Sequence, residues 1–220
     1  IDPESGDAIS GEAAVREAYA AQMGRHVARA ERSAPRGMPV LLGEFGVPYD
    51  LDGGVAFRTG DFSAQESALS ATYDALDAHL LHGTLWNYTP DNSNAWGDGW
   101  NGEDYSVFSR DQQTSAGDPD SGGRAVAGFC RPFARACAGQ LVTQRFDAGS
   151  GRFTLTIDAD PARSPSLVYA PRCHYPGGPI VSVTDGRVTA AGEQLLAWTC
   201  YAAGRQSLTL ERLTGAMECE

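Results

Sequence analysis

The sequence predicts two architectures in succession: an α/β segment over residues 1–138 and an all-β sandwich over residues 139–220. Amphipathic helical stripes alternate with short apolar runs in the first segment, which is typical of βα units on a parallel sheet. In the second segment, short runs of alternating polarity are separated by Gly, Pro, Asp and Ser, as in a β-sandwich. No run of 18 apolar residues is present, which argues against a membrane-spanning helix.

The first helix and strand are predicted over residues 11–31 and 38–43. Good helix formers dominate residues 11–31, and Val15 begins an apolar stripe with steps of three or four residues. Residues 38–43 are a short apolar run bounded by helix breakers, which favours a buried parallel strand. Another apolar stripe predicts a helix over residues 64–82, and residues 84–88 read as the next strand.

The connections around these elements carry their own signals. Ser63 and Glu66 have the spacing of a capping box at the start of the second helix. Residues 47–62 and 89–120 are polar and predict loops, and a third helix is expected over residues 122–137.

The second segment is predicted to hold about seven strands of even spacing. The runs that indicate them are 141–143, 153–157, 167–169, 180–183, 195–198 and 207–210. Asp185-Gly186 lies between two β-rich runs, which predicts a two-residue hairpin turn.

The chain is acidic, with a formal net charge of −11, and its 17 basic residues are all arginine. An acidic surface repels phosphate backbones, so we expect no nucleic-acid partner. The five cysteines lack a CxxC spacing, and we expect no zinc site. Two disulfides with one cysteine over would suit a secreted or extracellular, bacterial-type protein, whereas five buried thiols would suit a cytosolic one. We expect the pairs Cys130–Cys137 and Cys173–Cys200, with Cys219 either free or paired elsewhere.

Glu44 is the first candidate for chemistry, because it directly follows the apolar run of a predicted parallel strand. Desolvating a carboxylate there is costly without partners, and functional groups gather at the carboxyl ends of such strands. Gly43 and Gly46 leave room for a ligand or another backbone to approach. The alternative interpretation is a loop carboxylate in a salt bridge.

The loop after the next predicted strand concentrates aromatic, amide and acidic side chains. Its members are Trp86, Asn87, Tyr88, Asp91, Asn92, Asn94, Trp96, Asp98, Trp100, Asn101, Glu103, Asp104 and Tyr105. Rings stack on the apolar faces of sugars, and short polar side chains bind hydroxyls, so the loop predicts a carbohydrate platform. Its oxygen ligands are also of the kind that calcium prefers, although the ordered positions of an EF-hand are missing.

Two motifs together resemble glycoside hydrolase family 5. LLGEFG (41–46) is similar to the seventh-strand motif of that family, in which the glutamate is the nucleophile. LWNYTPDNSNAWGDGWNGEDYSVFSRD (85–111) resembles the eighth-strand region of its glycolipid-cleaving branches, which contain endoglycoceramidases, glucosylceramidases and steryl glucosidases. The Cys-Arg-Pro-Phe run at 130–133, followed by a β-sandwich, also resembles that group.

This resemblance implies the C-terminal part of a (β/α)8 TIM barrel over residues 1–138, followed by a C-terminal β-sandwich. The expected activity is endoglycoceramidase-like: retaining hydrolysis of the bond between sugar and lipid, without a metal or cofactor. Glu44 would be the nucleophile and Trp86 would stack on the sugar. Asn87 and Asp91 would bind its hydroxyls or orient the loop, and Tyr49 would contribute to the cleft for the lipid.

The sequence departs from the family pattern in one important respect. Family members need an acid/base glutamate in an Asn-Glu motif after the fourth strand, and this sequence contains no Asn-Glu pair. We therefore expect the chain to start after the sixth strand and to require the N-terminal part of the same enzyme as a partner. Glycolipid substrate and peripheral contact with lipid or micelle surfaces are the other expected interactions. Alternatives are a glucosylceramidase, a steryl glucosidase, or a non-catalytic carbohydrate- or lipid-binding module.

Overall fold

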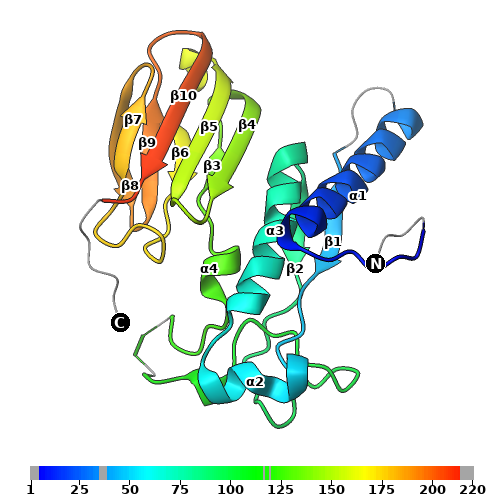
Figure 1. The fold of residues 1–220 in the computed structure, drawn as a ribbon. Helices are drawn as coiled ribbons and strands as arrows, with labels where there is room; N and C mark the ends of the chain where they lie inside the picture. The colour runs from blue at the N-terminus through cyan, green and yellow to red at the C-terminus, as the bar shows by residue number, and fades with distance from the viewer. Residues whose placement is uncertain (1–4, 35–38, 116, 119, 214–220) are drawn as a thin grey trace. The chain divides into compact units, whose positions relative to one another are not determined.

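The computed structural model describes residues 5–34, 39–115, 117–118 and 120–213 (Figure 1). The chain forms two compact units, Ile1–Phe129 and Cys130–Glu220. In the described residues, no helix is both long and apolar enough to cross a bilayer.

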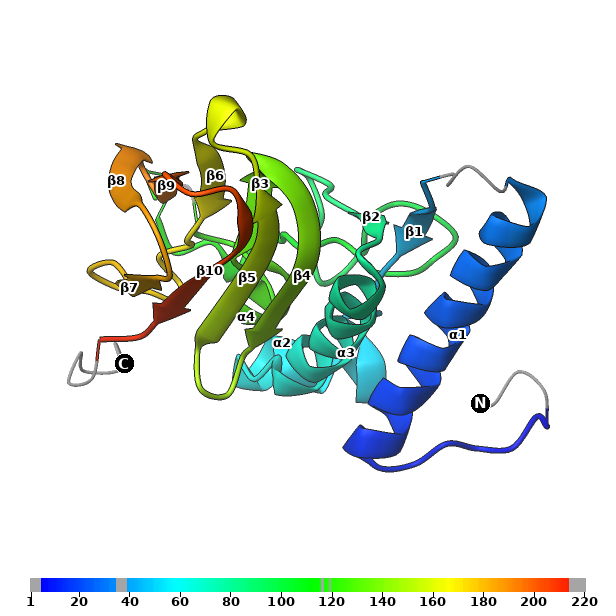
Figure 2. The same cartoon turned by 90° about the horizontal axis from the view of Figure 1, so that it is seen from above.

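The first unit contains the predicted alternation of helices and parallel strands. Its elements are α1 (Glu12–Ser33), β1 (Leu41–Phe45), α2 (Leu51–Thr59), α3 (Ser63–His79), β2 (His82–Leu85), the 3₁₀ turn η1 (Arg110–Gln112) and α4 (Val126–Phe129). Helices α1 and α3 pack side by side through a small core formed by Met23, Ala75 and Leu76 (Figures 1 and 2). Strands β1 and β2 pair in parallel, with Leu41 opposite His82. Each of these four elements lies within a few residues of its predicted position.

Helix α2 occupies a segment that the sequence predicted as a loop. It is kinked, because Asp52, Gly53 and Gly54 all have positive φ angles inside it. Gly54 is buried, and a Cβ atom there would lie 2.7 Å from the ring of Phe57. The Gly-Gly pair that reads as a helix breaker in the sequence therefore makes this tight bend.

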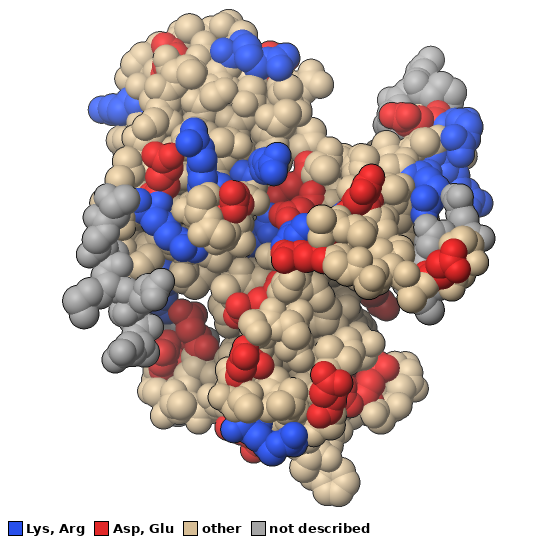
Figure 3. Space-filling view, in the orientation of Figure 1, with Lys and Arg blue, Asp and Glu red and all other residues tan. Residues whose placement is uncertain are grey.

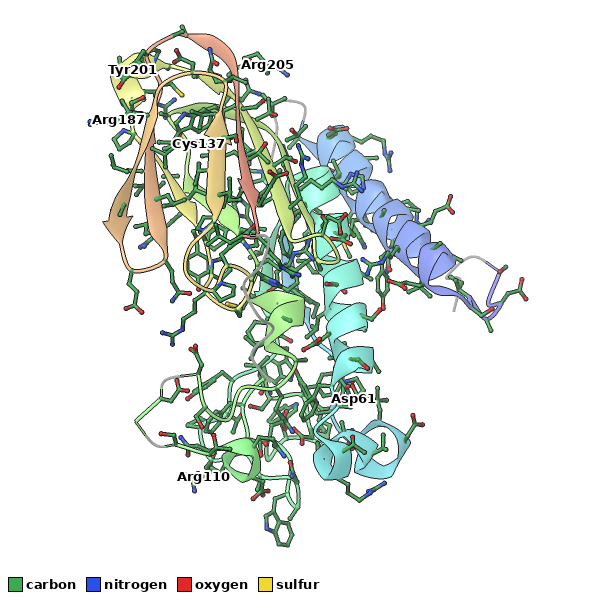
Figure 4. The ribbon with its side chains drawn as sticks, turned by 60° about the vertical axis from the view of Figure 1, so that its left-hand side comes forward. Asp61, Arg110, Cys137, Arg187, Tyr201 and Arg205 are labelled. Atoms are coloured by element: carbon green, nitrogen blue, oxygen red, sulfur yellow. The ribbon has the colours of Figure 1, made fainter. Side chains whose placement is uncertain are left out.

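The start of α3 also differs from the prediction. The side chain of Ser63 does not cap the helix. Instead the carboxylate of Asp61, which is labelled in Figure 4, accepts a hydrogen bond from the Ser63 backbone N–H at 2.9 Å. Hydrogen bonds from Ser63 hold the pKa of Asp61 below its usual value.

The predicted helix over residues 122–137 is wrong. Only the four residues of α4 are helical, and strand β3 (Phe133–Ala136) follows. Pro132 explains the change, because proline disfavours helical backbone in the residue before it. Since β3 pairs with β6, residues 130–138 belong to the second unit, and the division lies nine residues before the predicted boundary.

The second unit consists of two four-stranded antiparallel sheets. Its other strands are β4 (Gly139–Asp147), β5 (Arg152–Ala159), β6 (Ser166–Tyr169), β7 (Ile180–Val183), β8 (Arg187–Gly192), β9 (Leu195–Thr199) and β10 (Gly204–Glu211), with the 3₁₀ turn η2 (Pro161–Arg163) after β5. The strand orders are β4-β5-β10-β7 and β3-β6-β9-β8. Alternate residues of β5, including Phe153 and Leu155, join Val168 of β6 and Trp198 of β9 in one core. This arrangement agrees with the predicted sandwich.

Asp185-Gly186 is not a hairpin turn, contrary to the prediction. The strands on its two sides belong to different sheets, because β7 pairs with β10 and β8 pairs with β9. The Asp185 carboxylate accepts hydrogen bonds from the backbone N–H groups of Tyr201 and Ala202 at 2.7 and 2.8 Å. The turn is therefore a crossing between sheets that is anchored by Asp185.

No disulfide joins the four cysteines that the structure describes, and both predicted pairs are wrong. Cys130 and Cys137 flank strand β3, whose four residues span ~13 Å. Cys200 follows β9 and bonds through its backbone N–H to Ser164, just before β6. Cys173 lies beyond the other end of β6, so the five residues of β9 separate it from Cys200 by ~15 Å. A disulfide needs Cα atoms within about 7 Å. Cys219 lies outside the described residues.

Figure 3 shows the charged side chains on one face of the molecule. On the face shown, arginine and acidic side chains are interspersed, and acidic groups predominate around α2.

Candidate active site

Glu44 and Trp86 lie at the same ends of two neighbouring strands. Glu44 is the penultimate residue of β1, and Trp86 directly follows β2. Phe45 is in register with Leu85, and the Trp86 backbone N–H donates to the Phe45 carbonyl at 2.7 Å. Parallel pairing thus brings together two residues that are 42 positions apart in the sequence.

A glycine makes this juncture compact. A Cβ atom at Gly46 would lie 2.2 Å from the Trp86 carbonyl oxygen and 3.0 Å from the ring of Tyr105. Any larger residue would push the two strand ends apart. Gly46 therefore permits the close approach of another backbone, which is one of the two approaches that the sequence predicted.

The two strand ends and the loop that follows β2 enclose a pocket of about 400 Å³. Its lining consists of Glu44, Phe45, Gly46, Trp86, Trp100, Glu103 and Tyr105. Two carboxylates, two tryptophan rings and one tyrosine ring are the side chains expected of a sugar site. The volume lies within the usual range for small-ligand pockets.

Asp98 holds this loop in shape. Its carboxylate accepts three hydrogen bonds: from the Asn87 side-chain amide at 2.8 Å, from the Trp100 backbone N–H at 3.0 Å and from the Tyr105 backbone N–H at 3.2 Å. Asn87 was predicted to bind substrate hydroxyls or to orient the loop, and its amide N–H donates to Asp98 within the loop. It is absent from the pocket lining, and in this structure it connects the end of β2 to the loop.

A buried ion pair also stabilises this loop. Arg124 is fully buried, and its guanidinium donates to both Asp104 carboxylate oxygens at 2.8 and 2.5 Å. It also donates to the Ser106 carbonyl, and the buried Asn92 amide donates to Asp104 at 2.8 Å. Because Asp104 is committed to Arg124, it does not join its neighbours as a calcium ligand. In the described part of the chain, no three His, Cys, Asp or Glu side chains are placed to hold a metal ion.

Tyr49 belongs to this support and not to the pocket, which corrects the prediction that it contacts lipid. Its side chain is 1% exposed, and its ring lies 4.2 Å from the Arg124 guanidinium carbon. The phenol donates to the Arg124 carbonyl at 3.2 Å. Burial raises the pKa of Tyr49 far above its usual value, so the phenol stays protonated.

Asp91 is exposed and does not line the pocket, so the structure does not place it with Glu44. Trp100, Glu103 and Tyr105 do line it. The sequence placed these three in the carbohydrate platform without singling them out. Their signal was the density of aromatic and acidic residues, and it gave no indication of which side chains share a wall.

A family model matches most of the second unit. The model of the "Glycoside hydrolase family 5 C-terminal domain" matches residues 131–210. Residues 131–210 are a glycoside hydrolase family 5 C-terminal domain. The family resemblance that the motifs at 41–46 and 85–111 indicated is thereby confirmed.

Curated relatives extend the similarity into the first unit. A glucosylceramidase of Cryptococcus neoformans is 35% identical over 168 residues, which is 73% of this chain and 22% of that protein. An ergosteryl-beta-glucosidase of Saccharomyces cerevisiae is 37% identical over 105 residues, covering 48% of this chain and 14% of that protein. The chain therefore spans less than a quarter of the length of these two relatives.

Solved structures show the same fold. Cryptococcus neoformans sterylglucosidase 1 in complex with tris has a TM-score of 0.82 at 29% identity, over 95% of this chain and 33% of that one. Endo-glycoceramidase II from Rhodococcus sp., in its ganglioside GM3 complex, has a TM-score of 0.61 at 20% identity, over 95% of this chain and 40% of that one. At 20% identity, the similarity to endo-glycoceramidase II shows a shared fold only.

Proposed function

We propose that this chain is the C-terminal part of a retaining β-glycosidase that cleaves the bond between sugar and lipid in a glycolipid. The observation that carries the proposal is the pocket itself: Glu44 and Trp86, at adjoining strand ends, face one cavity with further aromatic rings. Carboxylates at the carboxyl ends of parallel strands are where α/β barrels place catalytic groups. Family membership makes glycoside hydrolysis the reaction class.

In the proposed reaction, one Glu44 oxygen attacks the anomeric carbon while the bond from that carbon to the leaving oxygen breaks. A carboxylic acid on the upstream part of the enzyme gives its proton to the leaving oxygen. The same group then takes a proton from water, whose oxygen attacks the anomeric carbon and releases Glu44. Trp86 stacks on the sugar, and Asp98 keeps the aromatic loop in place around it.

The strands of the first unit support an upstream partner segment. Among the described strands, β1 and β2 hydrogen-bond only to each other, so each has an unpaired edge. Leu41, the first residue of β1, is 59% exposed although it is apolar. Unpaired edges are normally covered or paired. We infer that six further strands complete a (β/α)8 barrel in which β1 and β2 are the seventh and eighth.

We further propose that the substrate carries a single glucose on a lipid. The relatives with more than 30% identity are named glucosylceramidase and ergosteryl-beta-glucosidase. The endoglycoceramidase-like activity expected from the motifs has only a fold-level likeness behind it. Hydrolysis of glucosylceramide, a steryl glucoside and a complex ganglioside, compared side by side with the full-length protein, separates the three activities.

Substituting Glu44 tests the proposal in the full-length protein. Glu44→Gln keeps the shape of the side chain but removes the charge that forms the glycosyl ester. We expect hydrolysis to fall at least about a thousandfold, which corresponds to ~4 kcal/mol of lost transition-state stabilisation. Glu31→Gln, on the exposed face of α1, is the matched control and should keep wild-type activity. More than a tenth of wild-type activity in Glu44→Gln would contradict the assignment.

A further inference from the structure

The pocket contains a second carboxylate that the reaction described above does not use. Glu103 lines the same cavity as Glu44 and is half-buried. Its carboxylate makes no hydrogen bond or ion pair with any of the residues that the structure describes. A partly desolvated carboxylate without a partner is costly, so hydrogen-bond donors from a ligand would stabilise it.

The backbone on both sides of Glu103 is fixed. Its N–H donates to the Trp100 carbonyl at 3.0 Å, and its own carbonyl accepts from the Asp98 N–H at 3.3 Å. Gly97 permits this contact, because a Cβ atom there would lie 2.1 Å from the Glu103 carbonyl oxygen. The next residue, Asp104, is locked by the buried Arg124. The Glu103 side chain is therefore presented to the pocket from a backbone that is held in place on both sides.

The neighbours of Glu103 indicate which donors it would meet. Trp100 and Trp86 line the same pocket, and aromatic rings stack on the apolar face of a sugar ring. A sugar held in that way presents its hydroxyl groups around its edge. An ionised carboxylate accepts up to two such hydroxyls, with hydrogen bonds stronger than those between neutral groups.

We propose that Glu103 accepts hydrogen bonds from hydroxyls of the glucose in the pocket and thereby selects a sugar in which those hydroxyls are unsubstituted. This inference rests on the proposed glycosidase function. A site built to bind hydroxyls discriminates strongly against analogues that lack them, because its buried polar group is left unpaired. A further sugar attached at such a hydroxyl would remove one donor, so Glu103 favours lipids with one glucose over extended glycolipids.

The test pairs variants of the full-length protein with modified substrates. An aryl β-glucoside and its 3-, 4- and 6-deoxy analogues are hydrolysed by wild type, Glu103→Gln and Glu103→Ala, with Glu31→Ala as the control on α1. We expect Glu103→Ala to lower kcat/KM for the parent glucoside by about 10- to 100-fold, the usual loss for hydrogen bonds to a charged group. For at least one deoxy analogue the variant and the wild type should become nearly equal, because the missing hydroxyl and the missing carboxylate are the same interaction.

Other outcomes contradict specific parts of the inference. If the losses from Glu103→Ala and from every deoxy analogue simply multiply, Glu103 does not bind those hydroxyls. If the variant is impaired with poor leaving groups but not with activated aryl glycosides, Glu103 is an acid/base group and not a hydroxyl-binding one. Glu103→Gln is nearly identical in shape to the wild type, so it keeps the test informative if the alanine variant misfolds. A wild-type enzyme inactive on every β-glucoside would overturn the proposed function itself, whereas the first two outcomes leave it standing.

Discussion

The buried pair Arg124–Asp104 predicts a large and specific loss of stability when it is broken. Arg124→Met removes the guanidinium but keeps much of the side-chain volume. It leaves the Asp104 carboxylate, only 4% exposed, without its cation, and it also removes the donors to the Ser106 carbonyl. Breaking a buried pair by removing one partner typically costs 3–5 kcal/mol. We expect a loss of about that size in the unfolding free energy of the part that contains the loop.

The assay is urea unfolding of the full-length protein, followed by tryptophan fluorescence, because Trp86, Trp96 and Trp100 all lie close to this network in the sequence. Arg205→Ala is the matched control. It breaks the exposed pair Arg205–Asp158, whose atoms are 2.9 Å apart, and should cost less than about 1 kcal/mol. The double variant Arg124→Met/Asp104→Leu removes both charges and should recover much of the loss. An Arg124→Met protein within 1 kcal/mol of wild type would refute this reasoning.

Three further outcomes follow from the structure. Trp86→Ala should lower kcat/KM by an amount that corresponds to about 1–3 kcal/mol of activation free energy, with little change in Tm. A large fall in Tm with normal kinetics would make Trp86 a core residue. Tyr49→Phe should lower stability by about 0.5–1.5 kcal/mol, the worth of its hydrogen bond to Arg124, and leave kcat and KM for the glycolipid unchanged, whereas altered KM would return Tyr49 to the lipid cleft. Cys200, 2% exposed, should resist alkylation in the native protein and react in urea, and fast native labelling measured by mass spectrometry would contradict its burial.

Sequence reasoning located the elements whose signals are local. The apolar stripes of α1 and α3 and the bounded apolar run of β1 depend only on neighbouring residues, and the structure forms all three. Helix α2 was missed because Gly53-Gly54 reads as a breaker, although the two glycines only kink it. The end of α4 at Phe129 was missed because a helical composition continues to Cys137, although Pro132 disfavours helical backbone in the residue before it.

Features that depend on distant partners were beyond the sequence. Asp185-Gly186 has the composition of a hairpin turn, but the partners of β7 and β8 are β10 and β9, and only the sheet topology shows this. The cysteine count suggested disulfides, yet β3 and β9 hold the expected partners apart. Topology, and not local composition, decides both cases.

The candidate site shows the same division. Glu44 was predicted from its place after an apolar run, and the family resemblance implied the role of Trp86. Parallel pairing places the two together. Tyr49 was assigned to the lipid cleft because it lies near Glu44 in sequence, but its hydrogen-bond partner is Arg124, 75 positions away. Asn87 and Asp98 form a contact within one loop that composition alone does not reveal.

The most direct test of the account is to trap the sugar on the enzyme. The full-length protein is incubated with an activated 2-deoxy-2-fluoro-β-glucoside, which slows the release of a covalent glycosyl-enzyme. The protein is then digested and its peptides are sequenced by mass spectrometry. We predict a single fluoroglucosyl adduct on Glu44, within the peptide that contains LLGEFG, and no adduct in Glu44→Gln. An adduct on another carboxylate, or inactivation that persists in Glu44→Gln, would contradict the assignment of Glu44 as the nucleophile.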